Sequence, residues 1–392
     1  MNTEPRLSKT MWPLLLALSS SLVLPSNLFA DERPLIEQWL DGDVDANYTE
    51  ITYDGPPIRL RFSSFLSPSG GLYEVQKRAL DRLEADTGGM IQPEAYWGSS
   101  LADGQSGAID AVNEGLVDYS TCYVQFNPGP HELQLALQMP FIFETSLAGV
   151  MAATSVYPEY LNDEYEDTGV YLARLSMTPP QQIFSRRSAI REVGDLRGER
   201  TWVVGDLGVQ YVNATGASPV PLSLTEMYSA FQTGVVDHVI THNAAGMLFG
   251  INEITGSHTT LNLWPQSLEL CVNRDFFDDL PEDLQDVFYH WLQLANLADS
   301  ILYFDRDADI SLNELENQGV GFHEPEGDAY SQFVDAVQPV ADDFIAELEE
   351  SGHPANDFVG ELRDYAEKYN QLTADEISQQ ILDEPLPGLI DF

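Results

Sequence analysis

Strand-like and helix-like patterns alternate along most of this chain, and the alternation constrains its fold more than any other feature. Residues 58–64 alternate as a strand, 70–89 repeat as an amphipathic helix that ends at glycines, and 91–97 alternate again. A helix over 105–116 and a strand over 117–124 follow. Repeated strand–helix units place their strands parallel, so this region predicts an α/β lobe with a largely parallel sheet.

A second series of strands and helices begins near residue 169 and contains a sharply delimited helix–strand unit at 221–243. Ser223 and Glu226 have the spacing of a capping box, which begins a helix, and Gly234 ends it. Residues 235–240, which are apolar at four of six positions, then predict a buried strand. We also predict strands at 169–177, 200–204, 258–264 and 267–273, and helices at 145–167, 208–215, 281–318, 326–350 and 354–371.

The first thirty residues have the features of a secretory signal. Arg6 and Lys9 precede an apolar run at 11–24, which is too short to span a bilayer, and a small-residue end follows at Ala30. We expect cleavage near Ala30, export to the periplasm, and a remainder, 31–392, long enough for two lobes.

Acidic residues dominate the rest of the chain. With Glu4, Arg6 and Lys9 removed from 63 acidic and 18 basic residues, the net charge is −46. Nucleic acid is therefore excluded as a partner. Lysine is scarce and the acids are dispersed, and such a surface repels itself unless salt screens it, with a Debye length of about 3 Å at 1 M. We interpret the chain as a halophile's exported protein.

The two cysteines, Cys122 and Cys271, cannot by themselves hold together a fold of this size. An oxidising periplasm would permit a disulfide, but the sequence does not supply the Cα separation. We expect two inert thiols, with a disulfide as the alternative.

Sequence signatures of catalysis, of cofactor binding and of metal binding are missing. The chain has no Gly-x-Ser-x-Gly elbow, no glycine-rich nucleotide loop and no His-Glu-x-x-His, so we expect no enzyme activity, cofactor or metal. His238 and His242 have a zinc-like spacing, but we expect them in a strand and loop without a third ligand. Residues 305–316 resemble a calcium loop with Ile310 in place of the required glycine, so we predict an acidic helix face instead.

Six blocks in order resemble the solute-binding proteins of tripartite ATP-independent periplasmic (TRAP) transporters, the DctP-like family. The blocks are TGGMIQPEAYWGSSL, AIDAVNEGLVDYS, LQMPFIFE, VGDLRGERTWVV, TGASPVPLSLTEMYSAFQTGVVD and LPEDLQDVFYHWLQLA. The resemblance implies an α/β fold with two lobes, an inter-lobe cleft and a long helix spanning both lobes. It implies 31–176 plus 265–308 as lobe I and 177–264 plus 309–392 as lobe II.

The resemblance also implies where a solute binds, and it reveals a departure. The arginine that commonly clamps a ligand carboxylate in the family is replaced here by Trp202, and a second arginine of some members aligns with Gln182. The other cleft positions carried over by the resemblance are Phe65, Asp103, Tyr123, Leu224 and Thr241.

Two interpretations remain for how the chain compensates for the missing arginine. In the first, Arg186 or Arg187 replaces it; the opposing view is that both are surface charges near a turn. Aromatic side chains at 65, 123 and 202 instead form a pocket for a quaternary ammonium or a flat ring, or belong to the core. Asn243 and His242 are further candidate contacts beyond the predicted strand.

We therefore expect a periplasmic receptor that binds a small organic solute, an organic acid by resemblance, and delivers it to a TRAP membrane permease. Aromatic and zwitterionic solutes are the alternatives suggested by Trp202. An enzyme or a sensor subunit on the same scaffold is the alternative function.

The acidic composition generates a first prediction. Dialysis from about 1 M to about 0.1 M sodium chloride should lower the melting temperature markedly, because acidic side chains then repel one another across a longer Debye length. Differential scanning calorimetry measures this, with an uncharged osmolyte as the control for general solvent effects. A flat response to salt would contradict the halophile interpretation.

Overall fold

The structure is a computed structural model that describes residues 32–103, 107–126, 131–166 and 168–392. The predicted signal segment lies outside these residues, as do 105–106 of the predicted helix 105–116. The chain divides into 1–33 and a compact unit, Pro34–Phe392, and every helix and strand named here lies in the latter. In the part of the chain described, no helix has the length and apolarity needed to cross a membrane.

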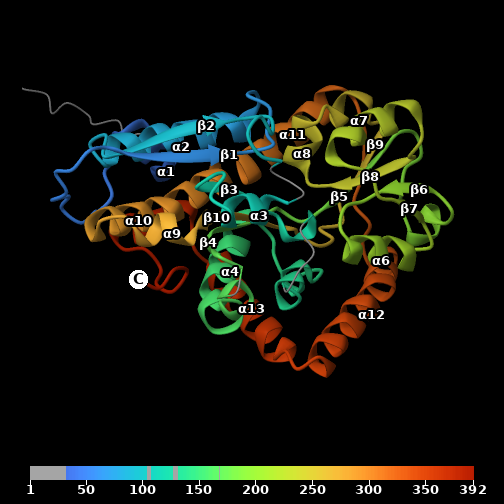
Figure 1. Ribbon diagram of the computed structural model, residues 1–392. Helices are drawn as coiled ribbons and strands as arrows, with labels where there is room; N and C mark the ends of the chain where they lie inside the picture. Colours follow the sequence, from blue (N-terminus) through green and yellow to red (C-terminus); the bar gives the residue numbers. More distant parts are fainter. Residues whose placement is uncertain (1–31, 104–106, 127–130, 167) are drawn as a thin grey trace, which may run out of the picture. The chain divides into compact units, whose positions relative to one another are not determined.

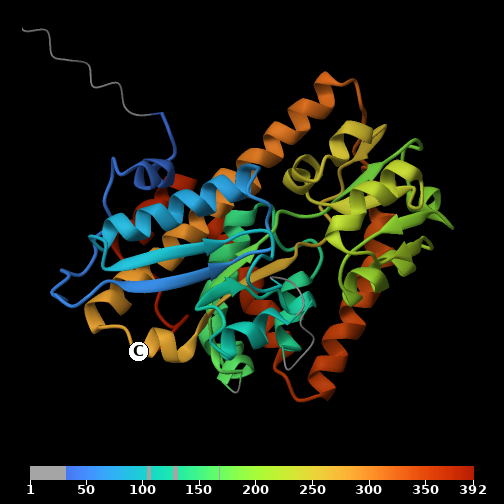
Figure 2. The ribbon, with the colours of Figure 1, turned by 45° about the horizontal axis from the view of Figure 1, so that its top comes forward.

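A five-stranded sheet in the order β2-β1-β3-β10-β4 forms the centre of the first lobe. All its strands point the same way except β10, which is antiparallel to both neighbours. Helix α2 lies along β1 and β2 (Figure 2), and α4 and α10 pack on β4. The elements are β1 (Ile58–Ser63), α2 (Gly71–Asp86), β2 (Ile91–Tyr96), α3 (Ala108–Asn113), β3 (Tyr119–Thr121), α4 (Ser146–Tyr160), α5 (Asp163–Glu166), β4 (Val170–Met177), β10 (Ser267–Asn273), α9 (Arg274–Asp278) and α10 (Glu282–Asp299).

A six-stranded sheet in the order β11-β9-β5-β8-β6-β7 forms the centre of the second lobe. Here β5 is the reversed strand, antiparallel to β8 and β9, whereas the other pairings are parallel. The elements are β5 (Gln182–Ser185), β6 (Arg200–Trp202), α6 (Asp206–Ala214), β7 (Ser218–Val220), α7 (Leu224–Thr233), β8 (His238–Thr241), α8 (Asn243–Leu248), β9 (Ser257–Thr259), α11 (Arg306–Asn317) and β11 (Gly321–His323). The first sheet is therefore largely parallel, as predicted, and each of the two sheets is mixed by one reversed strand.

The two reversed strands adjoin the segments that cross between the sheets. Residues 178–181 lead from β4 to β5, and 260–266 lead from β9 to β10. A third connection is the helix that the sequence predicts over 281–318. It runs from α10 through a π-helical segment, Ser300–Asp305, into α11 without a break in helical structure. The fold inferred from the resemblance, two α/β lobes spanned by a long helix, is confirmed.

The C-terminal region returns from the second lobe to the first. Helix α12 (Asp328–Glu350) packs on α6, and α13 (Ala355–Asn370) packs on α4 (Figure 1). Helix α14 (Ala374–Asp383) packs on α1 (Leu35–Asp41) and α10. The lobe boundaries remain a prediction, and these contacts favour placing 355–392 with the first lobe. Neither α1 nor α14 was predicted, although Thr373 and Glu376 form a capping box at the start of α14.

Local predictions for the unit at 221–243 hold except at the strand's start. The capping box forms, with Glu226 Oε2 accepting from the Ser223 backbone N–H at 3.2 Å, and Gly234 takes φ 75° at the helix end. Val235 is 49% exposed, and β8 begins only at His238. The predicted strand 258–264 also shortens to β9, because residues 260–266 form the crossover instead.

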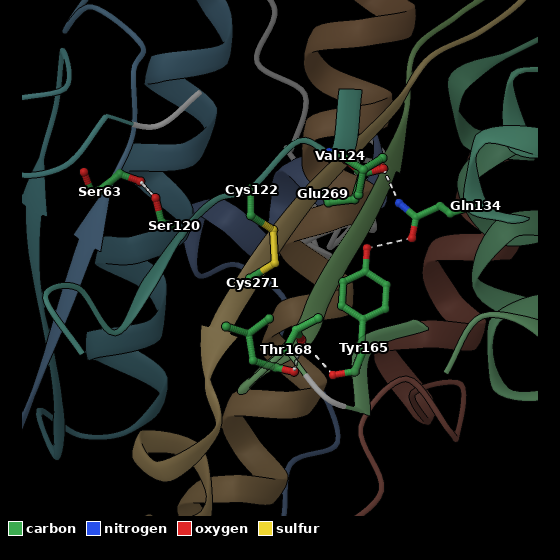
Figure 3. Close-up of a disulfide and its surroundings, with 10 residues drawn as sticks. Ser63, Ser120, Cys122, Val124, Gln134, Tyr165, Thr168, Glu269 and Cys271 are labelled. Atoms are coloured by element: carbon green, nitrogen blue, oxygen red, sulfur yellow. Dashed lines mark hydrogen bonds between the residues drawn. A yellow bond between two sulfur atoms is a disulfide. The ribbon is translucent and has the colours of Figure 1, made fainter. Parts of the chain in front are cut away.

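Cys122 and Cys271 form a disulfide, so the expectation of two free thiols is wrong. The bond joins the residue after β3 to β10 (Figure 3). Antiparallel pairing of these strands brings the two Cα atoms to 5.9 Å, inside the range a disulfide spans. The sequence could not reveal this, because the cysteines are 149 residues apart.

The disulfide generates a second prediction. Replacing both Cys122 and Cys271 by alanine should lower the free energy of unfolding by about 2–5 kcal/mol, because the bond closes a long loop in the unfolded chain. Urea titration at constant salt measures the change. The wild-type protein in dithiothreitol serves as the control and should lose a similar amount, whereas a double variant as stable as oxidised wild type would contradict the argument.

Candidate functional site

A cavity lies between the two sheets and is walled by both lobes, the crossovers and the long helix. Its volume is about 550 Å³, including its opening to solvent. The lining residues are Phe65, Leu66, Leu72, Tyr123, Gln125, Thr178, Gln181, Trp202, Val204, Leu224, Thr241, His242, Ala245, Leu248, Phe249, Gln266, Leu268, Tyr303 and Phe304.

The strand ends explain why these side chains meet. Phe65 follows β1 and Tyr123 follows β3, whereas Trp202 ends β6 and Thr241 ends β8. Parallel strands end at the same edge of a sheet, and ligands of α/β proteins bind at that edge. Both sheets present this edge to the cavity. Phe65 and Tyr123 also contact each other edge to face, with ring centroids 5.6 Å apart.

The crossovers form a second part of the wall. The Thr178 and Gln181 N–H groups donate to the carbonyls of Gln266 and Trp264 at 2.9 and 3.1 Å. The Gln266 N–H in turn donates to Thr178 Oγ1 at 2.9 Å. Because the segments hold each other, the polar side chains at 178, 181 and 266 keep fixed positions at the cavity.

The π-helical segment contributes Tyr303 and Phe304. The next residue, Asp305, accepts hydrogen bonds from the backbone N–H groups of Ser146 and Leu147 at 2.9 and 3.2 Å. This contact fixes the long helix against the start of α4, so both aromatic rings are held where the helix crosses the lobes.

A buried network supports the wall of the first lobe (Figure 3). Glu269, fully buried on β10, accepts from the Val124 N–H at 2.9 Å and from Gln134 Nε2 at 2.5 Å. The Tyr165 hydroxyl donates to Gln134 Oε1 at 2.6 Å. Burial raises the pKa of Glu269, and the hydrogen bonds it accepts partly offset this. Together with the disulfide, the network fixes the segment that carries Tyr123.

Trp202 belongs both to the cavity and to the core of the second lobe. It is only 1% exposed and packs in a cluster with Phe184, Met227 and Phe231. Its indole N–H donates to the Leu222 carbonyl at 3.0 Å. The indole therefore offers a solute its apolar surface but no free hydrogen-bond donor.

Of the described residues that line the cavity, none is aspartate, glutamate, lysine or arginine. The polar side chains of the lining are those of glutamine, threonine, histidine and tyrosine instead. Gln125 Oε1 is buried without a hydrogen-bond partner among the described residues. The site can thus bind an uncharged ring and offer neutral hydrogen-bonding groups.

The side chain of Gln182 does not line the cavity. Its amide instead forms hydrogen bonds to the second crossover segment, residues 260–266. Its Oε1 accepts from the N–H groups of Leu261 and Asn262 at 2.8 and 3.1 Å, and its Nε2 donates to Asn262 Oδ1 at 2.7 Å. Asn262 has a φ of 49°, so these bonds stabilise an unusual backbone turn.

Arg186 and Arg187 lie outside the cavity lining because β5 is reversed. They follow β5, whose carboxyl end lies at the amino ends of its neighbours, and the Arg186 N–H donates to the carbonyl of Asp237, just before β8. Arg187 is exposed. The structure therefore favours the alternative that both are away from the solute.

Two further predicted contacts also lie outside the lining. Asn243 begins α8, and its Oδ1 is 2.9 Å from His258 Nε2. Asp103 is exposed. By contrast Phe65, Tyr123, Trp202, Leu224 and Thr241 come together as expected, and their role in binding stays a prediction.

Sequence reasoning missed the crossover and helix contributions. Thr178 comes directly before two prolines that end the preceding strand, a signal that could have marked the crossover. Tyr303 and Phe304 give no such signal, because a π-helical segment has no sequence pattern of its own.

Within the described residues, no group of three or more histidine, cysteine, aspartate or glutamate side chains is arranged to hold a metal ion. His238 Nδ1 is 2.8 Å from Ser185 Oγ. Residues 306–316 are helical, so the prediction of a helix instead of a calcium loop is confirmed. Asp307, however, is buried and does not belong to a solvated face.

Comparison with known proteins decides the family. Residues 62–348 match the family described as bacterial extracellular solute-binding protein, family 7. The chain belongs to this family. Its members are periplasmic proteins of TRAP transporters that bind small organic solutes and work with membrane permease components. The resemblance inferred from the sequence is confirmed.

Family 7 relatives include the C4-dicarboxylate-binding periplasmic protein of Rhodobacter capsulatus, 24% identical over 74% of this chain and 88% of that protein. A TRAP solute-binding protein of Bordetella bronchiseptica with bound mandelate superposes with a TM-score of 0.71 at 22% identity, covering 80% of this chain and 99% of the other. A TRAP solute-binding protein of Rhodoferax ferrireducens in complex with benzoate superposes with a TM-score of 0.74 at 18% identity, covering 80% of this chain and 99% of the other. These likenesses show the shared fold.

The double role of Trp202 generates a third prediction. Trp202→Ala should lower the free energy of unfolding of the solute-free protein by about 3–5 kcal/mol, because it leaves a large cavity in the hydrophobic core of the second lobe. Urea titration measures this. Arg187→Ala is the control and should stay within about 0.5 kcal/mol of wild type. An unchanged Trp202→Ala variant would show that the indole does not support the core.

Proposed function

We propose that this family 7 protein is the periplasmic receptor of a TRAP transporter for a small organic acid with an aromatic body. The observation that supports this most directly is the cavity lining, which combines six aromatic rings with neutral polar groups and no arginine. The rings are Phe65, Tyr123, Trp202, Phe249, Tyr303 and Phe304. A flat ring buries well against such a wall and gains from edge-to-face contact.

Solved relatives support an aromatic solute. The Bordetella bronchiseptica and Rhodoferax ferrireducens proteins hold mandelate and benzoate, and a marine metagenome protein holds 3-hydroxybenzoate. Other neighbours, such as that of Chromohalobacter salexigens, hold glucuronate and have a lower TM-score of 0.68. A sugar acid would place its hydroxyls against a wall that contains six aromatic rings, where each hydroxyl left without a polar partner costs binding free energy.

An acid bound here would meet neutral donors elsewhere in the lining, since Trp202, at the position of the usual guanidinium, has no free hydrogen-bond donor. Loss of a bidentate arginine contact weakens binding by about 1.5–3 kcal/mol, and aromatic burial must offset that loss. A zwitterionic or quaternary ammonium solute is the second candidate. The aromatic faces of Tyr123 and Trp202 favour it, since such faces attract a cation by about 0.5–2 kcal/mol.

Solute capture would proceed by closure of the lobes. Because the lining comes from both lobes, a solute has its full set of contacts only when they close on it, and binding shifts the population towards the closed state. The crossovers and the long helix would bend. We propose that the closed form presents its solute to the permease, without chemical change to the solute.

The fourth prediction tests the solute class. Benzoate, mandelate, 3-hydroxybenzoate, succinate, glucuronate, glycine betaine and ectoine are screened by thermal shift at high salt. A ligand at 100 times its dissociation constant adds about 2.7 kcal/mol of stability, so aromatic acids should raise the melting temperature most. Stabilisation by succinate or glucuronate alone would contradict the proposal, and stabilisation by betaine alone would favour the second candidate.

Recovery of the solute distinguishes the receptor from an enzyme on the same scaffold. A bound aromatic acid should be recovered unchanged after prolonged incubation and denaturation of the protein, as measured by chromatography. A time-dependent product would support the enzyme alternative instead.

A further inference from the structure

His242 has two ring nitrogens in different surroundings. The residue is the N-cap of α8, and its Nδ1 accepts a hydrogen bond from the Ala245 backbone N–H at 3.3 Å. An N-cap acceptor satisfies one of the backbone donors that a helix start leaves free. One side of the imidazole is therefore committed to the protein.

The other nitrogen of His242 carries the hydrogen. A nitrogen that accepts a hydrogen bond is unprotonated, so in the neutral ring the hydrogen lies on Nε2. Burial lowers the pKa of His242 to about 3, which keeps the ring neutral at ordinary pH. The capping contact thus selects the tautomer that donates from Nε2.

Nε2 is the ring nitrogen of His242 that the protein leaves unused. The His242 ring lines the cavity. Its Nε2 has no hydrogen-bond partner among the described residues, and this atom is not completely shielded from solvent. The rings of Tyr303 and Phe304 hold the imidazole edge to face, with centroids 6.5 and 5.4 Å away. A positioned donor without a protein partner is suited to an acceptor on the ligand.

We propose that His242 donates its Nε2–H to an acceptor oxygen of the bound solute and so determines specificity in place of the family's arginine. The inference rests on the proposed function, an organic-acid receptor, and names the residue that would recognise the acid. A neutral donor does not depend on a mobile ion atmosphere as an exposed charge does, so its contribution should persist at high salt.

Two variants of His242 separate capping from recognition. His242→Asn keeps an acceptor near the position of Nδ1, and asparagine is a favourable N-cap, but it removes the Nε2 donor. His242→Gln is longer and can place an amide N–H near the position of Nε2. Benzoate is the probe, and its dissociation constant is measured by calorimetry for wild type and both variants.

We expect His242→Asn to bind benzoate at least tenfold more weakly while melting within a few degrees of wild type without solute. His242→Gln should recover much of the lost affinity. Benzoate binding by His242→Asn equal to that of wild type would overturn the inference and leave the receptor function standing.

The histidine tautomer provides an independent readout. A two-bond nitrogen–proton correlation spectrum of the ¹⁵N-histidine-labelled, solute-free protein should show His242 as the Nε2–H form. The Nδ1–H form would overturn the inference whether or not benzoate binds. A correct tautomer with no binding of any acid in the panel would instead refute the proposed function, and the inference with it.

Discussion

Mutual backbone hydrogen bonding between the two crossover segments is the constraint on which the rest of this molecule depends. Residues 178–181 and 260–266 run in opposite directions and bond to each other. Each crossover leaves one sheet at the carboxyl edge of its parallel strands and enters the other sheet at the same kind of edge, so β5 and β10 run opposite to the other strands. Both sheets can then present the carboxyl ends of their parallel strands to one shared space.

This arrangement sorts the side chains that a solute can reach from those it cannot. Residues that follow parallel strands, such as Tyr123 and His242, reach the cavity, whereas Arg186 and Arg187 follow a reversed strand and are carried to the opposite edge. The side-chain amide of Gln182, at the start of β5, accepts hydrogen bonds from the second crossover and holds it in place. Strand direction therefore explains why the two arginines lie outside the cavity lining.

Sequence patterns predict the elements well where a local rule applies. The capping box of Ser223 and the terminating Gly234 delimit α7, and the helical pattern over 281–318 corresponds to one uninterrupted helix. Prediction fails where the deciding contact is remote. The disulfide, the reversal of β5 and β10 and the short helix α1 all depend on partners far along the chain.

The disulfide has a consequence for how a guest is received. Cys122 directly precedes Tyr123, so the bond to β10 anchors one wall of the cavity covalently, and Glu269 anchors it again two residues later at Val124. That wall is ordered when the chain folds, and little of its conformational freedom remains to be lost on association. An arriving molecule should meet this wall already in place, with the opposite lobe left to complete the binding surface.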